Sequence, residues 1–389
     1  KHGIKNREAI NRKANELLQQ YGFKHIKAEH QIDEYNFEDR KLVEIVKATY
    51  FHPKIVVIDE TTTALSQEGR EELYKHMDRI RKEGNTVIFI SHDLPEVLDK
   101  SDTITIMRDG VYIDTVKSAD VTEDDLKRLM VGREVTGDYY RPDYDEKVSD
   151  EVVLSVRNVS VPGVLEDVSF DLHKGEILGF GGLSESGMHE IGKAIFGASY
   201  DRTGTVTLAD GTEINDIPTA IKHSIAYTSK DRDNESIIMN QSIGDNITLP
   251  SLDDLAGKCK LLSDKKLSDF ANKFAAQMSV KMQNIDQFVS DLSGGNKQKV
   301  VLARWIGKDS DILVLDSPTR GIDIKVKQDI YQLMDTMRKH NKSIIMISEE
   351  LMELIGMCDR IIIMKDGKLN GELPRSRDLD ENLLISKMV

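Results

Sequence analysis

The segment 292–298 contains residue types that can bind a phosphate group. Ser293, Gly294 and Gly295 stand directly before a run of lysines and apolar residues, a pattern typical of a helix N-terminus. At such an end the free backbone N–H groups and the positive end of the helix dipole favour an anion, here a nucleotide phosphate. An ordinary capped helix would also explain Ser-Gly-Gly, so the segment needs support from elsewhere in the chain.

A carboxylate further along supplies that support. Residues 312–316, Ile-Leu-Val-Leu-Asp, form an apolar run that predicts a buried strand ending at Asp316. Strand ends of this kind are where Mg²⁺-nucleotide chemistry is commonly placed. The two segments together indicate an α/β protein that binds a nucleotide.

The order and spacing of these segments resemble the signature helix and the Walker B strand of ABC-transporter ATPases. The run Gly-Gly-Asn-Lys-Gln-Lys-Val, with Leu-Ala-Arg behind it, is similar to the sugar-importer branch of that family, the ribose, galactose and xylose type. This resemblance implies a RecA-like P-loop NTPase core with antiparallel β and helical subdomains. It also implies that Gln298, like Ser293, Gly294 and Gly295, belongs to a nucleotide-binding site.

Composition limits the class of protein. The chain has 389 residues, 39% hydrophobic and 31% charged, and suits two globular domains of about 150 to 250 residues each. No apolar run approaches the ~18 residues of a membrane span, so we expect any role at a membrane to be exercised from the aqueous side. The formal net charge of −14 argues against a nucleic-acid partner. Cys259 and Cys358 lack metal-ligand spacing and are interpreted as reduced core residues of a cytoplasmic protein.

An internal repeat sets the domain organisation. The strand pattern at residues 55–59 matches that at 312–316, and both end in Asp, 257 positions apart. The same offset of 257 relates Met-Arg-Asp-Gly at residues 107–110 to Met-Lys-Asp-Gly at 364–367. The sequence therefore predicts a tandem of two copies of one α/β fold. Near the start of the chain, apolar residues at spacings of three and four predict a helix over residues 8–30.

The second copy has a glycine-rich loop that the first copy lacks. This loop runs from Gly179 to Gly187, includes Gly182, and occupies the P-loop position. Subtracting the offset of 257 from 182 gives −75, so the first copy's loop would precede Lys1, and we expect a fragment of a longer protein. The predicted domains are the C-terminal part of a first ABC ATPase domain at residues 1–133, a linker at 134–151, and a complete second domain at 152–389.

Three candidate residues of the first copy follow from the resemblance. Asp59 and Glu60 end the first strand, where the family's Asp holds the Mg²⁺ shell and its Glu polarises the attacking water. His92 ends a second buried strand pattern, at the position of the family's switch histidine, which contacts the γ-phosphate. An Asp-Glu pair or a lone His after a strand is usually structural. The place of these residues in the repeat favours the catalytic roles.

The second copy departs from the family pattern at the matching positions. Met188 stands where the P-loop needs Lys and His189 where it needs Ser or Thr, so a plain strand-to-helix turn competes with a working loop as the interpretation. The other residues of this degenerate site include the loop glycines Gly182 and Gly187 and the Walker B residue Asp316. Lys230, Ser317 and Glu349 stand where the family has its Q-loop residue, its catalytic Glu and its switch His.

The first copy's signature segment is degenerate as well. The offset places residues 35–41 opposite 292–298, and Glu38 and Asp39 stand where N–H groups would meet phosphate. Two carboxylates would repel a triphosphate. We therefore interpret this segment as an acid-rich helix N-terminus that suits its own dipole.

The substitutions segregate by nucleotide site. The family's domains pair head to tail, so each ATP lies between one copy's P-loop and Walker B and the other copy's signature. For this chain the resemblance implies a competent composite site of Asp59, Glu60 and His92 with the second copy's signature. The other composite site would combine the residues of the second copy that depart from the family pattern with residues 35–41 of the first copy. We expect no hydrolysis at this site.

The predicted function is that of the ATP-binding and hydrolysing subunit of a carbohydrate importer, an ATPase and translocase. The resemblance implies ATP and Mg²⁺ as cofactors, an integral-membrane sugar permease dimer as partner, and an extracellular or periplasmic sugar-binding protein as an indirect one. It also implies a peripheral place on the cytoplasmic face of the plasma membrane. We expect the fragment itself to be inactive. The alternative is a regulatory or scaffolding ATP-binding protein of the ABC class without a transport role.

Overall fold

The computed structural model describes residues 6–51, 53–59, 61–91, 93–108, 111–123, 125–126, 129, 139–144, 147–183, 185–322 and 324–388. The chain divides into two compact units, Lys1–Glu134 and Val135–Val389, called unit 1 and unit 2 below. Among the described residues, no helix has both the length and the apolar character needed to cross a membrane.

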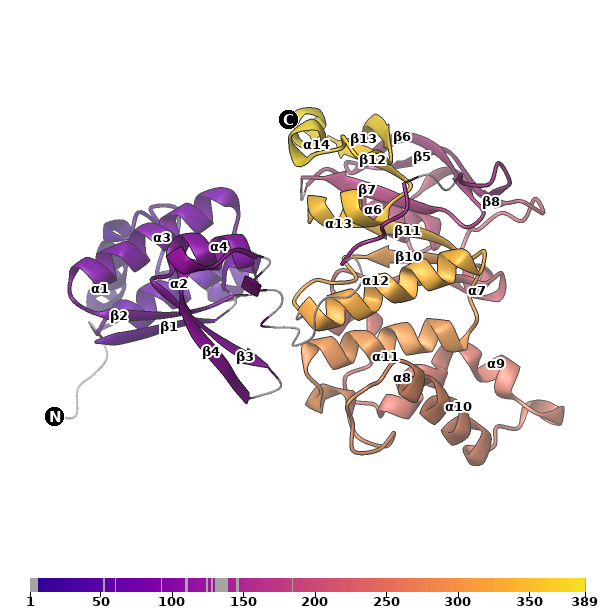
Figure 1. Ribbon diagram of the computed structural model, residues 1–389, viewed down its shortest axis with the longest axis horizontal. Helices are drawn as coiled ribbons and strands as arrows, with labels where there is room; N and C mark the ends of the chain where they lie inside the picture. Colours follow the sequence, from indigo (N-terminus) through magenta and orange to yellow (C-terminus); the bar gives the residue numbers. More distant parts are fainter. Residues whose placement is uncertain are drawn as a thin grey trace. The chain divides into compact units, whose positions relative to one another are not determined.

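Unit 1 combines helices with two small sheets (Figure 1). Strands β1 and β2 pair in parallel, and β3 and β4 pair antiparallel. The helices and strands described in unit 1 are α1 (Arg7–Gln20), α2 (Phe37–Thr49), β1 (Ile55–Asp59), α3 (Gln67–Lys82), β2 (Thr86–Ile90), α4 (Leu94–Lys100), β3 (Thr103–Arg108) and β4 (Val111–Lys117).

Helix α1 is shorter than the sequence predicts. It ends at Gln20 and not near residue 30, because Gly22 takes a left-handed conformation with φ of +87° directly after the C-cap. Phe23 and Ile26 then continue the apolar pattern outside the helix and pack into the core of unit 1. The prediction over residues 8–30 was therefore wrong in its second half.

Unit 2 is built around a six-stranded sheet of order β13-β12-β7-β11-β10-β9, parallel except for β13. A three-stranded antiparallel sheet of order β6-β5-β8 lies on one side of it, and the helices α8 to α11 lie on the other (Figure 1). The strands are β5 (Val152–Val161), β6 (Leu165–His173), β7 (Ile177–Gly182), β8 (Thr203–Leu208), β9 (Ile225–Thr228), β10 (Ile312–Asp316), β11 (Ser343–Ile347), β12 (Arg360–Lys365) and β13 (Lys368–Pro374). The helices are α6 (Met188–Ile195), α7 (Ile217–Lys222), α8 (Ile243–Thr248), α9 (Leu252–Leu255), α10 (Asp264–Gln277), α11 (Gly294–Gly307), α12 (Ile324–Lys339), α13 (Leu351–Met357) and α14 (Glu381–Met388).

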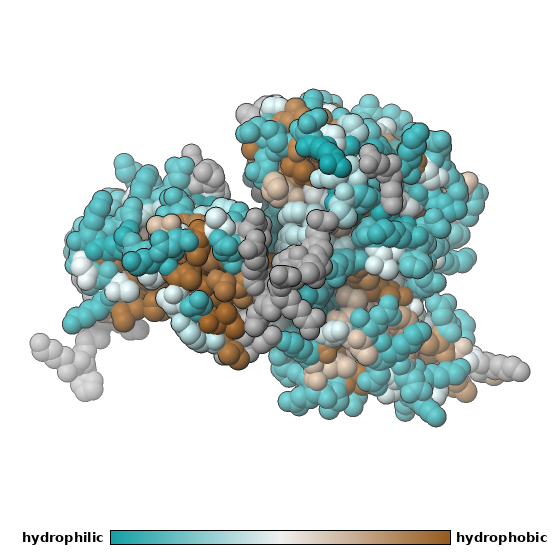
Figure 2. All heavy atoms as spheres, viewed as in Figure 1, coloured by the Kyte–Doolittle hydropathy of each residue, from teal (hydrophilic) through white to brown (hydrophobic). Residues whose placement is uncertain are grey.

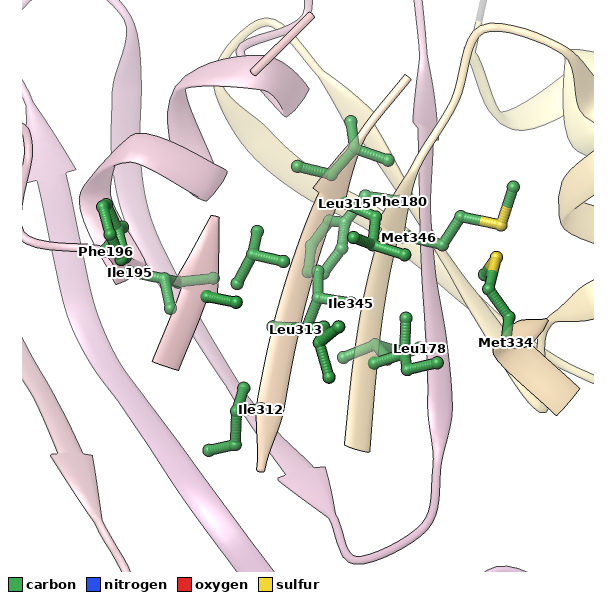
Figure 3. Close-up of a cluster of buried hydrophobic side chains, with 14 of the residues drawn as sticks. Leu178, Phe180, Ile195, Phe196, Ile312, Leu313, Leu315, Met334, Ile345 and Met346 are labelled. Atoms are coloured by element: carbon green, nitrogen blue, oxygen red, sulfur yellow. The ribbon is translucent and has the colours of Figure 1, made fainter. Parts of the chain in front are cut away.

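The core of unit 2 lies on its parallel sheet. Every residue of β7, β10 and β11 is buried, as expected of parallel strands covered on both faces. Figure 3 shows side chains of these strands, such as Phe180 and Leu315, among Ile195 of α6 and Met334 of α12. This packing fixes the carboxyl ends of the strands, where the candidate site residues lie.

The equivalent strands of unit 1 have a different environment. Every second residue of β1 and β2 points to the same exposed face. On this face Ile55, Val57, Ile88 and Ile90 are 59%, 58%, 47% and 46% exposed. Figure 2 shows apolar side chains gathered over the strands of this unit. Among the described residues of unit 1, no element corresponds to α6 or β7, the elements that cover or extend these strands in unit 2.

The two units share element bounds at a constant offset. Moving a residue number by 257 turns β1 to β4 into β10 to β13, and α1 into α10. The strand registers follow the same shift, since Ile55 pairs with Thr86 in unit 1 and Ile312 pairs with Ser343 in unit 2.

Part of the segment assigned to the linker packs against unit 2. Arg141 is only 4% exposed, and its guanidinium donates to the carbonyl of Met357 at 2.9 Å and to Asp359 at 2.8 Å. Burial opposes the charge, but hydrogen bonds to Asp143 and Asp359 outweigh it and raise the pKa of Arg141. This buried ion pair anchors residues 139–144 to the body of unit 2.

Candidate functional site

The N-terminus of α11 is the first candidate region, and it lies wholly in unit 2. Ser293 is the N-cap, and it makes no side-chain capping bond to the described backbone N–H groups of the first turn. Its hydroxyl instead accepts from Nδ2 of Asn296 at 3.0 Å. Ser293 is exposed and Gly294 and Gly295 are half-buried, so this helix end presents hydroxyl and N–H groups to a ligand.

An arginine that sequence reasoning missed lies beside this helix end. A Cβ placed on Gly294 would come within 3.3 Å of Nη2 of Arg232, so a larger residue would require the guanidinium to shift by a few tenths of an ångström. Arg232 also donates from Nη1 to Oε1 of Gln298 at 3.3 Å. Gln298 is buried and held by its own unit, whereas the adjacent guanidinium adds positive charge to the helix end. The two residues are 66 positions apart, and no local motif connects them.

The matching helix end of unit 1 is closed by its own side chains. Asn36 caps α2 by accepting the N–H of Asp39 at 2.8 Å. Asp39 lies 2.6 Å from Nε2 of His25, and Glu38 accepts from the hydroxyl of Ser66 at 2.6 Å. These contacts agree with the interpretation of residues 35–41 as an acid-rich helix N-terminus, since the N–H of Asp39 is occupied and two carboxylates lie in the first turn.

The strand ends of unit 1 form the second candidate region. Asp59 is the last residue of β1, pairs in register with Ile90 of β2, and is exposed, so its carboxylate is open to a cation. Glu60 and His92, the two predicted catalytic residues, lie outside the described residues. Their assignment stays a prediction. No group of three or more His, Cys, Asp or Glu suited to a metal is found in the part of the chain that the structure describes.

The third region, at the strand ends of unit 2, brings together residues that sequence reasoning assigned to one degenerate site. Nδ1 of His189, on α6, lies 2.7 Å from Oδ1 of Asp316. Lys230 donates to Glu349 at 2.8 Å. Nε2 of His189 is 3.1 Å from Nζ of Lys230, which links the two pairs. The hydroxyl of Ser317 donates to Asp316 at 3.2 Å. We call these five residues the His189 cluster.

The His189 cluster combines two carboxylates with a lysine and a histidine, so its charges balance when His189 is protonated. Burial opposes the charged imidazole, but hydrogen bonds to Asp316 and Glu349 outweigh it and raise the pKa of His189. In its neutral form His189 donates from Nδ1 to Asp316 and accepts from Lys230. As a cation it donates to Asp316 and faces Glu349, whose Oε1 lies 3.5 Å from Nε2. Asp316, only 1% exposed, thus keeps a donor in either form.

The glycine-rich loop of unit 2 leads into this cluster without the cation of a P-loop. Gly182 ends β7, and Gly187 is the left-handed N-cap of α6 with φ of +86°. A Cβ on Gly187 would come within 2.7 Å of the carbonyl oxygen of Val164, so no larger residue fits. Met188, at the position of the P-loop Lys, is fully buried in the core. With Met188 inside and Asp316 bonded to His189, this arrangement does not fit Mg²⁺-ATP.

Comparison with known proteins identifies the family of the chain. A family model described as "ABC transporter" matches residues 165–320. The ribose import ATP-binding protein RbsA of Lactococcus lactis subsp. lactis is 39% identical over 385 residues, which cover 99% of this chain and 77% of that protein. The xylose import ATP-binding protein XylG of Thermoanaerobacter pseudethanolicus is 40% identical over 344 residues, 86% of this chain and 67% of that protein.

Solved structures show the same fold. The dimeric structure of MJ0796, described as a bacterial ABC transporter cassette, aligns with a TM-score of 0.51 at 21% identity, covering 57% of this chain and 99% of that one. A nucleotide-free ATP-binding cassette from an ABC transporter aligns with a TM-score of 0.51 at 18% identity, covering 60% of this chain and 95% of its own. These likenesses establish the α/β fold of an ABC ATPase.

Proposed function

Since this chain belongs to the family of ATP-binding subunits of ABC sugar importers of the ribose and xylose type, we propose that it hydrolyses ATP at one composite site to energise carbohydrate import. The observation that carries the proposal is the contrast between the open helix end at Ser293 and the self-paired His189 cluster. The first suits a nucleotide phosphate, and the second has replaced the groups that would bind one.

We propose further that the chain is a tandem of two ABC ATPase folds, with the first at residues 1–133, a linker at 134–151 and the second at 152–389. The constant offset of 257 in element bounds and strand register supports this reading. A repeat of this kind supplies two strand ends and two signature helices, from which two nucleotide sites are assembled.

The competent site joins residues from both copies. In this proposal Asp59 holds the Mg²⁺ shell, Glu60 polarises the attacking water and His92 contacts the γ-phosphate. The second copy contributes its signature helix. Bound Mg²⁺-ATP supplies the phosphoryl group that is transferred to water. The signature residues proposed to bind the nucleotide are Ser293, Gly294, Gly295 and Gln298.

The signature helix supplies fixed donors. Ser293 offers a hydroxyl, and the first backbone N–H groups of α11 offer dipoles whose orientation is set before the nucleotide binds. Arg232 holds Gln298 in place and adds charge beside Gly294. The degenerate site comprises Gly182, Gly187 and the buried Met188 with the His189 cluster, and it has a structural role in place of hydrolysis.

The partner in this proposal is an integral-membrane sugar permease dimer at the cytoplasmic face of the plasma membrane. A sugar-binding protein outside the membrane would deliver the substrate. The names of the relatives support this, since they describe import ATP-binding proteins for ribose and for xylose. Co-purification of a multi-spanning permease with the intact protein would distinguish transport from a regulatory or scaffolding role.

The test of hydrolysis is Glu60→Gln in the intact protein. Loss of the carboxylate that polarises water should lower kcat by about a hundredfold or more, with little change in KM for ATP. The matched control is Ser317→Ala, at the position 257 residues further on, which should stay within about twofold of wild type. Steady-state phosphate release measures both, and near-normal turnover by Glu60→Gln would contradict the proposal.

A further inference from the structure

A buried carboxylate in unit 1 receives hydroxyl groups from three segments of the chain. Glu96, on α4, is only 7% exposed. It accepts from Oγ1 of Thr62 at 3.0 Å, from Oγ of Ser91 at 2.7 Å, and from the hydroxyl of Tyr74 on α3. Each donor is a neutral hydroxyl, so the carboxylate is the common acceptor that holds them together.

Two of these donors flank the residues to which we assign catalysis. Thr62 lies two positions after Glu60, in the turn that follows β1. Ser91 directly precedes His92, at the end of β2. Glu96 therefore ties together the two loops that carry the proposed water-polarising and γ-phosphate-contacting residues.

The same network is built a second time in unit 2. Glu353 is 1% exposed and accepts from Ser348 at 2.7 Å and from the hydroxyls of Thr319 and Tyr331. Lys327 lies 3.6 Å from this carboxylate. Each of the four network residues stands 257 positions after its counterpart in unit 1. What differs is the neighbourhood, since this network borders Ser317 and Glu349 in place of a catalytic Glu and His.

The network depends on a carboxylate and not only on a polar side chain. A carboxylate offers about four acceptor positions and no protons, so it can accept from three hydroxyls at once. Gln has nearly the same shape, but its NH₂ group is a donor. It would face a hydroxyl that donates its own proton to the carboxylate of Glu96. Burial and the hydrogen bond to Glu96 raise the pKa of Tyr74, which keeps that phenol a donor. Thr62 and Ser91 both donate to Oε2 of Glu96, whereas Tyr74 donates to Oε1. Replacing Glu96 by Gln removes the negative charge that both loop hydroxyls donate to, so it should weaken the tie between the loops with little change in volume.

We propose that Glu96 is a positioning residue for ATP hydrolysis, which fixes the loops of Glu60 and His92 relative to each other by accepting from Thr62 and Ser91. The inference rests on the hydrolysis at the competent site proposed above. It adds a residue that touches neither the nucleotide nor the water and acts through the loops it joins. A small displacement of such loops lowers the rate of the chemical step more than the affinity for substrate.

The test compares Glu96→Gln with Glu353→Gln in the intact protein. Both variants remove a buried carboxylate that accepts from Thr, Ser and Tyr hydroxyls. Glu353→Gln also removes the charge that faces Lys327, so a purely structural role predicts that it lowers turnover at least as much as Glu96→Gln. Positioning predicts that Glu96→Gln lowers kcat by about tenfold to a hundredfold with KM for ATP within about threefold. Glu353→Gln should retain kcat within about twofold. Thermal unfolding of both variants reports the shared structural cost.

The outcomes separate this inference from the proposed function. Equal losses of kcat in the two variants, or a loss that appears only in KM, overturn the positioning role while Glu60→Gln remains inactive. If Glu60→Gln retains turnover, the proposed function fails and the inference fails with it. Should Glu96→Gln not fold, Ser91→Ala and its counterpart Ser348→Ala make the same comparison. Each removes one hydroxyl, which donates to the buried carboxylate and accepts one backbone N–H. A selective fall in kcat for Ser91→Ala supports positioning, and equal values for the pair overturn it.

Discussion

The two helix ends at Ser293 and Asn36 show how one fold can be either open to a ligand or closed to it. In unit 2 the N-cap Ser293 leaves the first turn of α11 uncapped by a side chain, beside Arg232. In unit 1 Asn36 caps α2 and Asp39 is paired with His25. The helices stand at the same place in the repeat. The side chains of the first turn, and not the backbone, therefore determine whether an anion site exists.

At the strand ends the exposed side chain belongs to unit 1 and the internally bonded one to unit 2, the reverse of the helix ends. Asp59 at the end of β1 is exposed, whereas Asp316 at the end of β10 is buried and bonded to His189. The residues of unit 2 that depart from the family pattern also satisfy its carboxylates, with His189 and Lys230 as the donors. A buried carboxylate without metal or donor would be costly, so Asp316 needs the donors that this network supplies.

The largest expected effect comes from transferring one side chain of the closed helix end to the open one. Gly295→Glu places in unit 2 the residue found at the corresponding position of unit 1, Glu38. A carboxylate in the first turn suits the helix dipole but repels a triphosphate, so the fold should persist while ATP turnover falls about a hundredfold. Steady-state kcat/KM for ATP measures the loss.

The reciprocal variant is the control. Glu38→Ala removes the carboxylate from the closed helix end, where Asn36 still caps α2. Turnover should stay within about twofold of wild type, because the proposed function assigns that helix end to the degenerate site only. A comparable fall in kcat/KM for both variants would show that the helix ends are not functionally distinct.

A second prediction concerns the His189 cluster as a structural replacement for a bound ligand. His189→Leu leaves Asp316 buried without its imidazole donor, and Ser317 is the weaker of its described donors. The free energy of unfolding of unit 2 should fall by about 2 to 3 kcal/mol, measured by urea denaturation. Adding Asp316→Asn should recover part of this loss, since it removes the uncompensated charge. An unchanged unfolding midpoint in His189→Leu would show that the cluster does not stabilise the fold.

Much of this arrangement could be predicted from the sequence because it depends on local patterns. Apolar runs that end in Asp predicted β1 and β10, and the family resemblance, with the constant offset, predicted that the residues of the His189 cluster would share a region. The helix over residues 8–30 was wrong beyond Gln20, since the pattern of apolar residues continues through a turn that Gly22 imposes. Periodicity reports which residues are buried and not whether the backbone between them is helical.

The contacts of Arg232 and Glu96 could not be predicted in the same way. Arg232 reaches Gln298 across 66 positions, and no spacing rule connects a strand-end loop to a helix end. Glu96 did leave a signal, because Glu353 recurs at the offset of 257 together with its three hydroxyl partners. A polar residue that recurs at the offset of an internal repeat, together with its hydroxyl partners, therefore predicts a buried network in both copies.

The smallest expected effect tests whether the outer pair of the His189 cluster matters as much as the inner one. Lys230 and Glu349 are 25% and 34% exposed, so solvent screens their attraction, and Lys230→Met should cost about 0.5 to 1 kcal/mol in urea denaturation. Lys193→Met is the matched control, because its pair with Glu235 is similarly close, at 2.7 Å, but lies outside the cluster. If the cluster acts as a unit, combining Lys230→Met with His189→Leu should give less than the sum of the two losses, whereas Lys193→Met should add to His189→Leu without coupling. Strict additivity for both combinations would reduce the cluster to two independent ion pairs. It would then be the Asp316–His189 contact alone that distinguishes the strand end of unit 2 from that of unit 1.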